Sequence, residues 1–380
     1  MAARALSGGA STGWRERWIG WRNALISDPR FQRWASSSPL TRLIARRRAR
    51  ALFDLCAGFV YSQVLLACVR LRLCEHLVNG PLGVADIARL IDLSPEAATR
   101  LLRAAASLRL VRALPGERYA LDDLGASLIG NPSVAGFVEH HILLYDDLRD
   151  PVALLRGEIS TSLSRFWPYA RDEAPGRSPD ESVAPYSALM SRSQALLAPD
   201  ILDAYPVSRH IGLLDVGGGE GGFLIEAAAR APKLELKLFD LPPVVERARL
   251  ALSKRGLSGR VETTGGNFFK DPLPRGADII TLVRIVHDHD DAAAVALMRA
   301  AWSALPPGGT LLIAEPMADT IGAEAIGDAY FGFYLLAMGS GRPRRFDELQ
   351  ALLEKAGFSQ IQAAPTRRPI LASIIVARKV

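Results

Sequence analysis

A histidine beside acidic residues is the side chain best suited to chemistry in this sequence. It is His287, in the segment RIVHDHDD over 284–291, which follows the apolar run Ile279–Val283. An imidazole has an unperturbed pKa of about 6.5, so it can take up and return a proton near neutral pH. If Ile279–Val283 is a strand of an open parallel sheet, His287 lies beyond its carboxyl end, where such sheets bind ligands. These observations predict that His287 acts as a general base on a bound substrate.

A glycine-rich turn provides the strongest ligand-binding signal. The segment LLDVGGGEGG over 213–222 ends an apolar run and precedes a helical pattern. Glycines let the backbone turn tightly and approach a ligand without an intervening Cβ. Such a turn can hold the pyrophosphate of a dinucleotide at a helix N-terminus, or the amino-acid part of S-adenosylmethionine. The turn alone does not separate these two ligands.

Two further polar positions follow the next two apolar runs. Asp240, in FDLP, comes about 25 residues after Asp215 and can accept hydrogen bonds from both hydroxyls of a ribose. In GGNFF over 265–269, Asn267 could bond the edge of an adenine while Phe268 covers its face. The simpler alternatives are a helix N-cap for Asp240 and an ordinary turn for Asn267.

These residues require a sheet with alternating strands and helices. We predict strands over Ile211–Val216, Leu234–Phe239, Val261–Thr264, Ile279–Val283, Thr310–Ala314, Ile361–Ala363 and Ala372–Ala377. We predict helices over Gly222–Ala231, Val244–Arg255, Ala292–Leu305 and Phe346–Ala356, with another over Tyr186–Tyr205 leading into the sheet. Strands that alternate with helices indicate a mostly parallel sheet covered on both faces.

A different pattern precedes this region. Short helices are predicted over Val84–Leu90 and Glu96–Leu108, with a β-hairpin around Pro115-Gly116. Helix, turn, helix and hairpin form a winged-helix pattern, which can bind DNA. The second helix, however, offers few arginines and no Asn or Gln that could read adenine. We therefore expect no nucleic-acid partner.

Composition places the chain among globular proteins with two domains. It has 380 residues, 49% hydrophobic and 23% charged, and a net charge of +6 that comes mostly from arginine. The three cysteines lie in one apolar stretch and lack metal-ligand spacing, so we expect reduced thiols and no metal site. The longest apolar run, Leu55–Val69, is shorter than a bilayer span. These features predict a cytoplasmic protein, on the inner membrane surface at most.

The N-terminal part is helical and unusually rich in tryptophan. Trp14, Trp18 and Trp21 recur at helical spacing with arginines between them, as in helices that lie at a membrane interface. The alternative is that these tryptophans pack on the protein itself or on a partner subunit. Ala51–Leu77 is predicted to form one or two buried helices, whereas 151–185 is predicted to be a linker or lid-like loop.

Taken in order, these motifs resemble a known enzyme family. LLDVGGGEG, FDLPPVVERA, GGNFFKDPLP, RIVHDHDD and LPPGGTLLIAEP, followed by a distal GF, are similar to the acetylserotonin/caffeate type of O-methyltransferase. The resemblance covers roughly residues 50–380. It implies a Rossmann-like class I methyltransferase domain with a seven-stranded sheet, a winged-helix dimerisation domain, S-adenosylmethionine as cofactor and a homodimer.

The resemblance also assigns roles to residues of this chain. His287 would take the proton of the acceptor hydroxyl, and Glu315 in AEP would orient it. The expected cofactor contacts are Asp215, Gly217, Gly219, Asp240, Leu241, Asn267, Phe268 and Arg284. For the acceptor pocket we expect Tyr186, Met190, Phe331, Tyr334 and Met338, the last three within an apolar run that should be buried.

Three positions depart from the family pattern. Asn267 stands where the family has Asp, and His289 where it has Trp. Pro343 stands in GRPR over 341–344, where a GxER-like segment of the family supplies a second glutamate that supports the histidine. Since proline cannot serve in that way, orientation of His287 is expected to depend more on Glu315.

The N-terminal stretch resembles one group within the family more closely. PRFQRWA, RYALDDLGASLIGNP and SALMSRSQALLAPDILDAYP are similar to the hydroxycarotenoid O-methyltransferases of phototrophic bacteria, the demethylspheroidene/hydroxyneurosporene type. This favours methylation of a hydroxycarotenoid. The alternatives are an O-methyltransferase of a phenol or polyketide, and a winged-helix regulator that only senses ligand. The expected divisions are an extension over 1–45, a dimerisation domain and linker over 46–185, and a catalytic domain over 186–380.

Overall fold

A computed structural model describes residues 13–166, 197–369 and 372–380 of the chain. Tyr186 and Met190, expected in the acceptor pocket, lie outside the described residues, as does 167–185 of the predicted linker. The chain divides into two compact units, Met1–Leu73 with Pro81–Ala120, and Cys74–Gly80 with Leu121–Val380. The boundary at 120–121 groups helices α7 to α10, which follow the winged helix, with the sheet.

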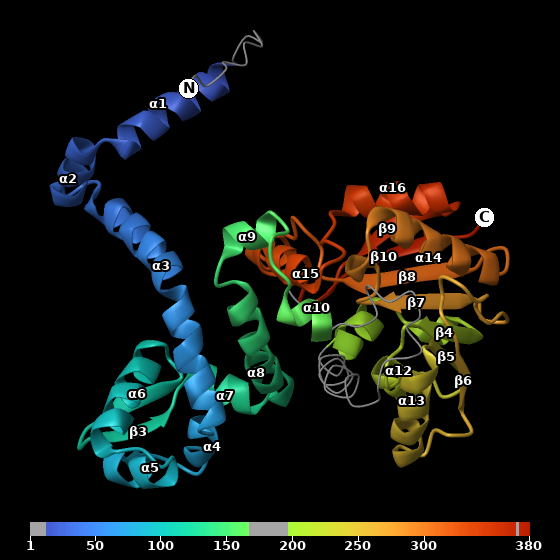
Figure 1. Cartoon of the computed structure of the whole chain (residues 1–380), viewed down its shortest axis with the longest axis horizontal. Coiled ribbons are helices and arrows are strands. Elements are labelled where there is room, and N and C mark those ends of the chain that lie inside the picture. Colours follow the sequence, from blue (N-terminus) through green and yellow to red (C-terminus); the bar gives the residue numbers. More distant parts are fainter. Residues whose placement is uncertain (1–12, 167–196, 370–371) are drawn as a thin grey trace. The chain divides into compact units, whose positions relative to one another are not determined.

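The first unit contains the predicted winged helix. Helices α5 (Val84–Leu90) and α6 (Pro95–Ser107) precede the hairpin strands β2 (Val111–Leu114) and β3 (Arg118–Leu121). Strand β1 (Leu82–Gly83) completes a three-stranded sheet in the order β1-β3-β2. The side chain of Ser94 caps α6 by accepting the N–H of Ala97 at 3.2 Å. Figure 1 shows these elements together with α3.

Three helices form the N-terminal part of the same unit: α1 (Trp14–Ser27), α2 (Pro29–Ser37) and α3 (Arg42–Arg70). The expectation of buried helices from Ala51 onward is wrong for α3, because only Leu66, Cys68 and Val69 of this helix are buried. The helix also begins earlier and runs for 29 residues. By length and composition α3 could cross a membrane, with a mean hydropathy of 1.8 over 18 residues. A helix that packs against a second subunit has the same composition.

The second unit contains the predicted seven-stranded sheet. Its strands are β4 (Gly212–Val216), β5 (Glu235–Asp240), β6 (Val261–Gly265), β7 (Ile279–Val283), β8 (Thr310–Glu315), β9 (Ser359–Ala364) and β10 (Ser373–Arg378). They lie in the order β6-β5-β4-β7-β8-β10-β9. The first five are parallel, and β10 is antiparallel to both β8 and β9. The carboxyl ends of β4 to β8 therefore meet at one edge, where the candidate residues follow them.

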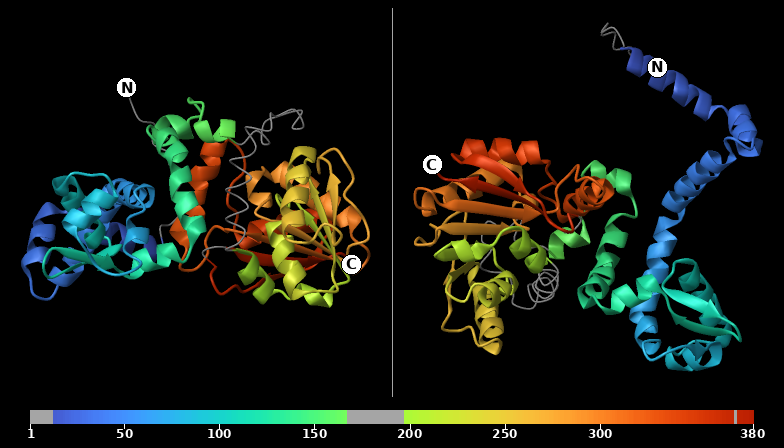
Figure 2. Two further views of the ribbon diagram at one scale, coloured as in Figure 1. Left: turned by 90° about the horizontal axis from the view of Figure 1, so that it is seen from below. Right: turned by 180° about the vertical axis from the view of Figure 1, so that it is seen from behind.

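Helices cover both faces of the sheet, as Figures 1 and 2 show. On one face lie α12 (Gly222–Arg230) and α13 (Pro242–Lys254), with a helix whose described part is 197–204. On the other lie α14 (Asp291–Ala304) and α16 (Phe346–Ala356). Strands β4 and β7 are buried throughout, as apolar strands between two helical layers should be.

The remaining helices of this unit are mostly short. They are α4 (Leu73–His76), α7 (Asp123–Ile129), α8 (Pro132–Asp147), α9 (Pro151–Leu155), α10 (Ser162–Phe166) and α15 (Gly332–Met338), with 3-10 turns η3 (Val207–Arg209) and η4 (Val286–Asp288). Helices α9 and α10 lie in the predicted linker, so that prediction is wrong for its first part. Residues Ala325–Phe331 (η5) form a π-helix, which local sequence gave no reason to expect.

Candidate active site

The cofactor half of the site is built on the turn after β4. The N–H of Gly219 donates to Oδ2 of Asp240 at 2.8 Å, and the N–H of Leu241 donates to Oδ1 at 2.7 Å. Gly217 is anchored to the neighbouring strand by its N–H bond to the carbonyl of Phe239, at 2.8 Å. The predicted turn and the predicted acid of the next strand therefore meet. Each carboxylate oxygen of Asp240 keeps acceptor capacity for a ligand hydroxyl.

Burial affects both acidic residues of this half. Burial raises the pKa of Asp240 to about 6, against the opposing hydrogen bonds from Gly219 and Leu241. It raises the pKa of Asp215 to about 7, although the hydroxyl of Thr281 donates to that carboxylate at 2.7 Å. Oδ2 of Asp215 has no partner among the described residues. Asp215 is thus a buried residue of β4 just before the turn, while Asp240 is the carboxylate at the end of β5.

Asn267 lies in an ordinary turn, which was the alternative to an adenine-binding role. Its Oδ1 accepts the N–H of Phe269 at 2.9 Å, and its own N–H donates to Asp271 at 2.8 Å. The ring centroid of Phe268 lies 4.6 Å from that of Phe269 and 5.6 Å from that of His289. His289, which follows β7, thus belongs to an aromatic cluster with the two phenylalanines that follow β6. The adenine-binding roles of Asn267 and Phe268 remain predictions.

His287 lies on η4, directly after β7, and is only 3% exposed. Its backbone N–H donates to Oε2 of Glu315 at 3.0 Å. Its ring nitrogen Nε2 lies 3.2 Å from Oδ1 of Asp288, while Nδ1 has no partner among the described residues. Glu315 is thus hydrogen-bonded to the main chain of His287, and its role in orienting the imidazole remains a prediction. Asp288 was not singled out from the sequence.

Two further charged residues lie close to His287, one at the end of β8 and one between β7 and η4. Glu315 is fully buried at the end of β8, and burial raises its pKa, with His287 and Arg344 opposing the shift. Arg284 adopts a left-handed backbone with φ of 57°, which is uncommon for a non-glycine residue. Its guanidinium carbon lies 5.7 Å from the ring centroid of Phe331. Arg284 therefore lies beside one of the predicted acceptor residues, and its role in cofactor binding remains a prediction.

The described residues predicted for the acceptor pocket gather beside His287. Phe331, Tyr334 and Met338 are buried in one apolar cluster with residues of α8, α9 and α10. The ring centroid of Phe331 lies 5.8 Å from that of His287. Asp288 and Arg284 both lie near enough to Tyr334 to affect its pKa, which burial raises above its usual range. The run predicted to be buried is therefore buried, and the roles of these residues in acceptor binding remain predictions.

Two histidine–tyrosine pairs in this cluster were not predicted. Nε2 of His140 lies 2.8 Å from the hydroxyl of Tyr334, and Nε2 of His141 lies 2.7 Å from that of Tyr330. Burial lowers the pKa of each imidazole to about 4, so both are neutral at physiological pH. The pairs join α8 to η5 and α15 across nearly 200 positions of sequence. Adjacent histidines on a helix carry no signal of such partners, so only the tertiary structure reveals them.

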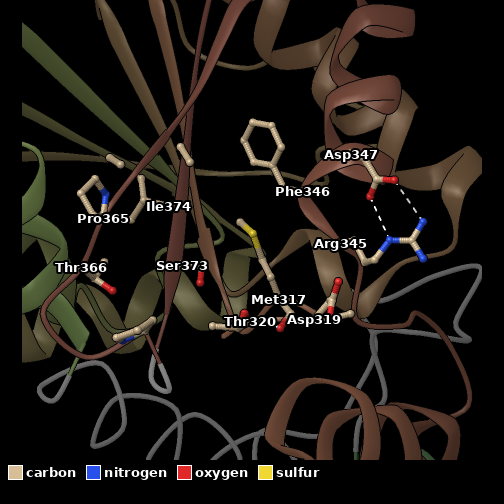
Figure 3. Close-up of a pocket in the computed structure, with 14 residues that line it drawn as sticks. Met317, Asp319, Thr320, Arg345, Phe346, Asp347, Pro365, Thr366, Ser373 and Ile374 are labelled. Carbon is tan, nitrogen blue, oxygen red and sulfur yellow. Dashed lines mark hydrogen bonds and ion pairs between the residues drawn. The ribbon is translucent and has the colours of Figure 1, made fainter. Parts of the chain in front are cut away.

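A separate cavity of about 520 Å³ opens near the end of β8. Figure 3 shows Met317 and Phe346 beside an ion pair between Arg345 and Asp347, whose nearest atoms are 3.0 Å apart. None of the residues predicted for the site lines this cavity. It is therefore distinct from the group around His287.

Comparisons with known proteins agree with this arrangement. The model of an O-methyltransferase domain matches residues 145–359, and that of an O-methyltransferase dimerisation domain matches residues 53–131. A demethylspheroidene O-methyltransferase of Cereibacter sphaeroides is 42% identical over 353 residues, covering 93% of each chain. Its counterpart from Rhodobacter capsulatus is 41% identical, covering 90% of this chain and 85% of the relative.

A solved structure extends the comparison to three dimensions. CalO1, a methyltransferase in calicheamicin biosynthesis in its SAH-bound form, matches with a TM-score of 0.72 and 26% identity. The match covers 88% of this chain and 98% of that one. Both the helical N-terminal unit and the sheet unit therefore have counterparts in one known architecture.

Proposed function

The chain belongs to the O-methyltransferase family, and from this premise we propose that it transfers the methyl group of S-adenosylmethionine to a hydroxyl of a hydroxycarotenoid. The observation that carries the acceptor class is the 42% identity to a demethylspheroidene O-methyltransferase over 93% of both chains. That similarity includes the N-terminal region, whose segments resemble the hydroxycarotenoid group more closely than the rest of the family.

The residues of the cofactor half fit S-adenosylmethionine. Gly219 has φ of 58°, and a Cβ placed there would meet no atom within 4 Å, so the turn has open space where a ligand would approach. Asp240 presents both carboxylate oxygens at the strand end and suits the two ribose hydroxyls. Gly217 and Gly219 would hold the amino-acid part. The bound cofactor supplies a methyl group on a positively charged sulfur.

His287 acts as the general base in this proposal. Its imidazole takes the proton from the acceptor hydroxyl, and Nε2 lies 3.2 Å from Oδ1 of Asp288. The carboxylate of Asp288 then stabilises the positively charged imidazole. Base catalysis of this kind contributes on the order of 10²–10⁴-fold to rate. An alkyl hydroxyl is less acidic than a phenol, so placement of the hydroxyl is expected to supply much of the remainder.

The acceptor pocket is apolar with a few polar groups, as small-molecule sites generally are. Phe331, Tyr334 and Met338 form its described wall, with Tyr330 and Arg284 nearby. An apolar wall suits a polyene chain. It also suits an aromatic polyketide, so the acceptor must be determined by experiment.

The test is methyl transfer from radiolabelled S-adenosylmethionine to hydroxycarotenoids and, in parallel, to a panel of phenols. The wild type is compared with His287→Gln and with the control His210→Gln, since His210 precedes β4 at the opposite end of the strands. Label in the carotenoid with the wild type and His210→Gln, but not with His287→Gln, supports the proposal. Label in phenols alone overturns the carotenoid acceptor and keeps the enzyme class. Cofactor binding without transfer to any acceptor would favour a ligand-sensing protein.

A homodimer is the expected assembly, because residues 53–131 match a dimerisation domain. The apolar side chains of α3 are accordingly exposed in the single chain, among them Leu52, Leu55 and Phe59. A second copy that covers α3 would account for this exposure.

The N-terminal helices are proposed to contact the inner surface of the membrane. Trp14, Trp18 and Trp21 are all at least half exposed on α1. Residues 13–54 contain ten arginines against three acidic residues, an excess larger than the +6 of the whole chain. Exposed tryptophans combined with clustered arginines are suited to an anionic lipid surface.

Co-sedimentation with liposomes tests this contact. The full chain is expected to bind vesicles that contain anionic lipid more strongly than zwitterionic ones. A variant lacking residues 1–35 should lose that preference, and so should a Trp14, Trp18 and Trp21 triple alanine variant. Equal binding by the truncated chain would contradict the membrane contact.

A further inference from the structure

The main chain around His287 is held by one short segment, Ser340–Arg344, which lies far from it in sequence. Four successive carbonyls, those of residues 286–289, each accept a hydrogen bond from this segment. The hydroxyl of Ser340 donates to Asp288 O at 2.8 Å. The backbone N–H of Arg342 donates to His287 O at 2.9 Å.

The guanidinium of Arg344 makes the other two bonds. Nη1 donates to Val286 O at 3.1 Å and Nη2 donates to His289 O at 2.7 Å. The guanidinium thus bonds carbonyls on both sides of His287 in the chain. Nε donates to Oδ1 of Asp291 at 2.9 Å. The side chain is completely buried. A buried charge is costly unless it is paired and hydrogen-bonded, and here every bond of the guanidinium goes to the histidine loop or to the helix that follows it.

Gly341 allows the close approach that these bonds require. A Cβ at this position would lie 2.0 Å from the carbonyl oxygen of His287 and 2.5 Å from the carbonyl carbon of Asp288. The residue also has φ of 77°, which other residues adopt only with strain. No other side chain could occupy this position without displacing the main chain of His287.

The imidazole itself receives little support from distant side chains. Glu315 bonds the backbone of His287 and leaves its Oε1 without a partner among the described residues. Pro343, which the resemblance predicts to replace a supporting glutamate of the family, has no side-chain polar group. Among the described residues, the ring lies beside Asp288 and Phe331, and the hydrogen bonds of His287 are made by its main chain.

We propose that Ser340–Arg344 sets the position of the His287 imidazole through the main chain of residues 286–289, with Arg344 as the positioning residue. This rests on the proposed role of His287 as base. Arg344 touches neither substrate nor cofactor in this scheme. It acts by holding the loop against displacement, and a displacement of about 1 Å can reduce a rate on the order of 10²-fold.

The test compares Arg344→Met and Arg344→Lys with the control Arg345→Met in the full chain. Arg345 is adjacent but half exposed, and it pairs with Asp347 at the start of α16. We expect Arg344→Met to lower kcat on the order of 10²-fold, with little change in KM for S-adenosylmethionine. Arg344→Lys should recover part of the loss, because it keeps the charge but not the planar fork. Arg345→Met should behave as the wild type.

A second readout does not depend on turnover. The chain has six histidines, so ring nitrogen resonances in ¹⁵N-histidine-labelled protein can be assigned to His287 by comparison with His287→Gln. Arg344→Met is expected to shift the His287 resonances and their pH titration, and Arg345→Met to leave both unchanged. If no acceptor is methylated, the proposed function fails, but the resonances still test the positioning role.

The proposal is overturned if the folded fraction of Arg344→Met retains wild-type kcat and unshifted His287 resonances, with only its melting temperature lowered. If Arg344→Met does not fold, Gly341→Ala provides the second probe, since its Cβ must displace the carbonyl of His287. A shift of the His287 resonances in that variant supports the proposal, and unchanged resonances overturn it.

Discussion

The two halves of the active site are built in different ways. The cofactor half uses local segments, the turn after β4 and the end of β5, whose key bonds join Gly219 and Leu241 to Asp240. The acceptor half joins segments far apart in sequence, such as His140 of α8 with Tyr334 of α15, and Arg344 with the loop of His287. The first half is held by backbone geometry at adjacent strand ends, and the second by buried side chains from several elements.

This difference predicts how substitutions will act. A change in the cofactor half removes contacts to a bound ligand and should appear in the cofactor affinity. A change in the acceptor half disturbs a packed set of buried polar groups and should appear in kcat, in acceptor KM or in stability. The following measurements test whether the two halves are independent.

Substitution of His287 is expected to have the largest effect. His287→Gln should lower kcat by roughly 10²–10⁴-fold, because the base is lost. The cofactor affinity should be unchanged when measured by calorimetry, since His287 belongs to the acceptor half. A comparable loss of cofactor affinity would show that the halves are coupled.

Asp240→Asn should weaken S-adenosylmethionine binding by about 10–100-fold, since hydrogen bonds to a charged group contribute about 1.5–3 kcal/mol. The amide also keeps only one acceptor oxygen for the ribose. Calorimetric titration measures the dissociation constant. At saturating cofactor kcat should stay near the wild-type value, and a large fall in kcat would instead connect Asp240 to the acceptor half.

The cofactor affinity should also depend on pH. The pKa of Asp240 is raised to about 6, so its carboxylate is the main form above that pH and is lost as pH falls through it. Because the ribose hydroxyls bond the ionised form, affinity should fall by about tenfold per pH unit below this value. Titrations between pH 5 and 8 measure the slope, and Asp240→Asn should reduce it. The pKa of Asp215 is raised to about 7, so its titration accounts for the slope that remains. His140 and His141 do not contribute, because both are neutral in this range.

Tyr334→Phe should have the smallest effect on catalysis. It removes the buried hydrogen bond to Nε2 of His140, which costs about 0.5–1.5 kcal/mol of stability. Acceptor KM should change more than the KM for cofactor. Thermal unfolding and steady-state kinetics measure both effects, with Tyr61→Phe on the exposed α3 as control. A larger change in cofactor KM than in acceptor KM would contradict the assignment of Tyr334 to the acceptor half.

The structures of the two units were predicted from the sequence with different accuracy. In the sheet unit, the boundaries of α16 were predicted without error, and each strand within two residues of its observed ends. Buried parallel strands and glycine turns have strong local patterns, which explains this accuracy. The burial of α3 was predicted wrongly, because an apolar helix can be buried by its own chain or by a partner subunit. Periodicity does not distinguish these two cases.

The sequence by itself determined the sheet, the glycine turn, Asp240 and the position of His287 at a strand end. Each of these depends on residues close together in the chain and on the rule that carboxyl ends of parallel strands share one edge. Only the tertiary structure decided that Glu315 bonds the main chain of His287, that Arg284 faces Phe331, and that Arg344 is buried against the loop. Those contacts join distant segments, and a single sequence carries no local pattern for which buried polar groups will meet.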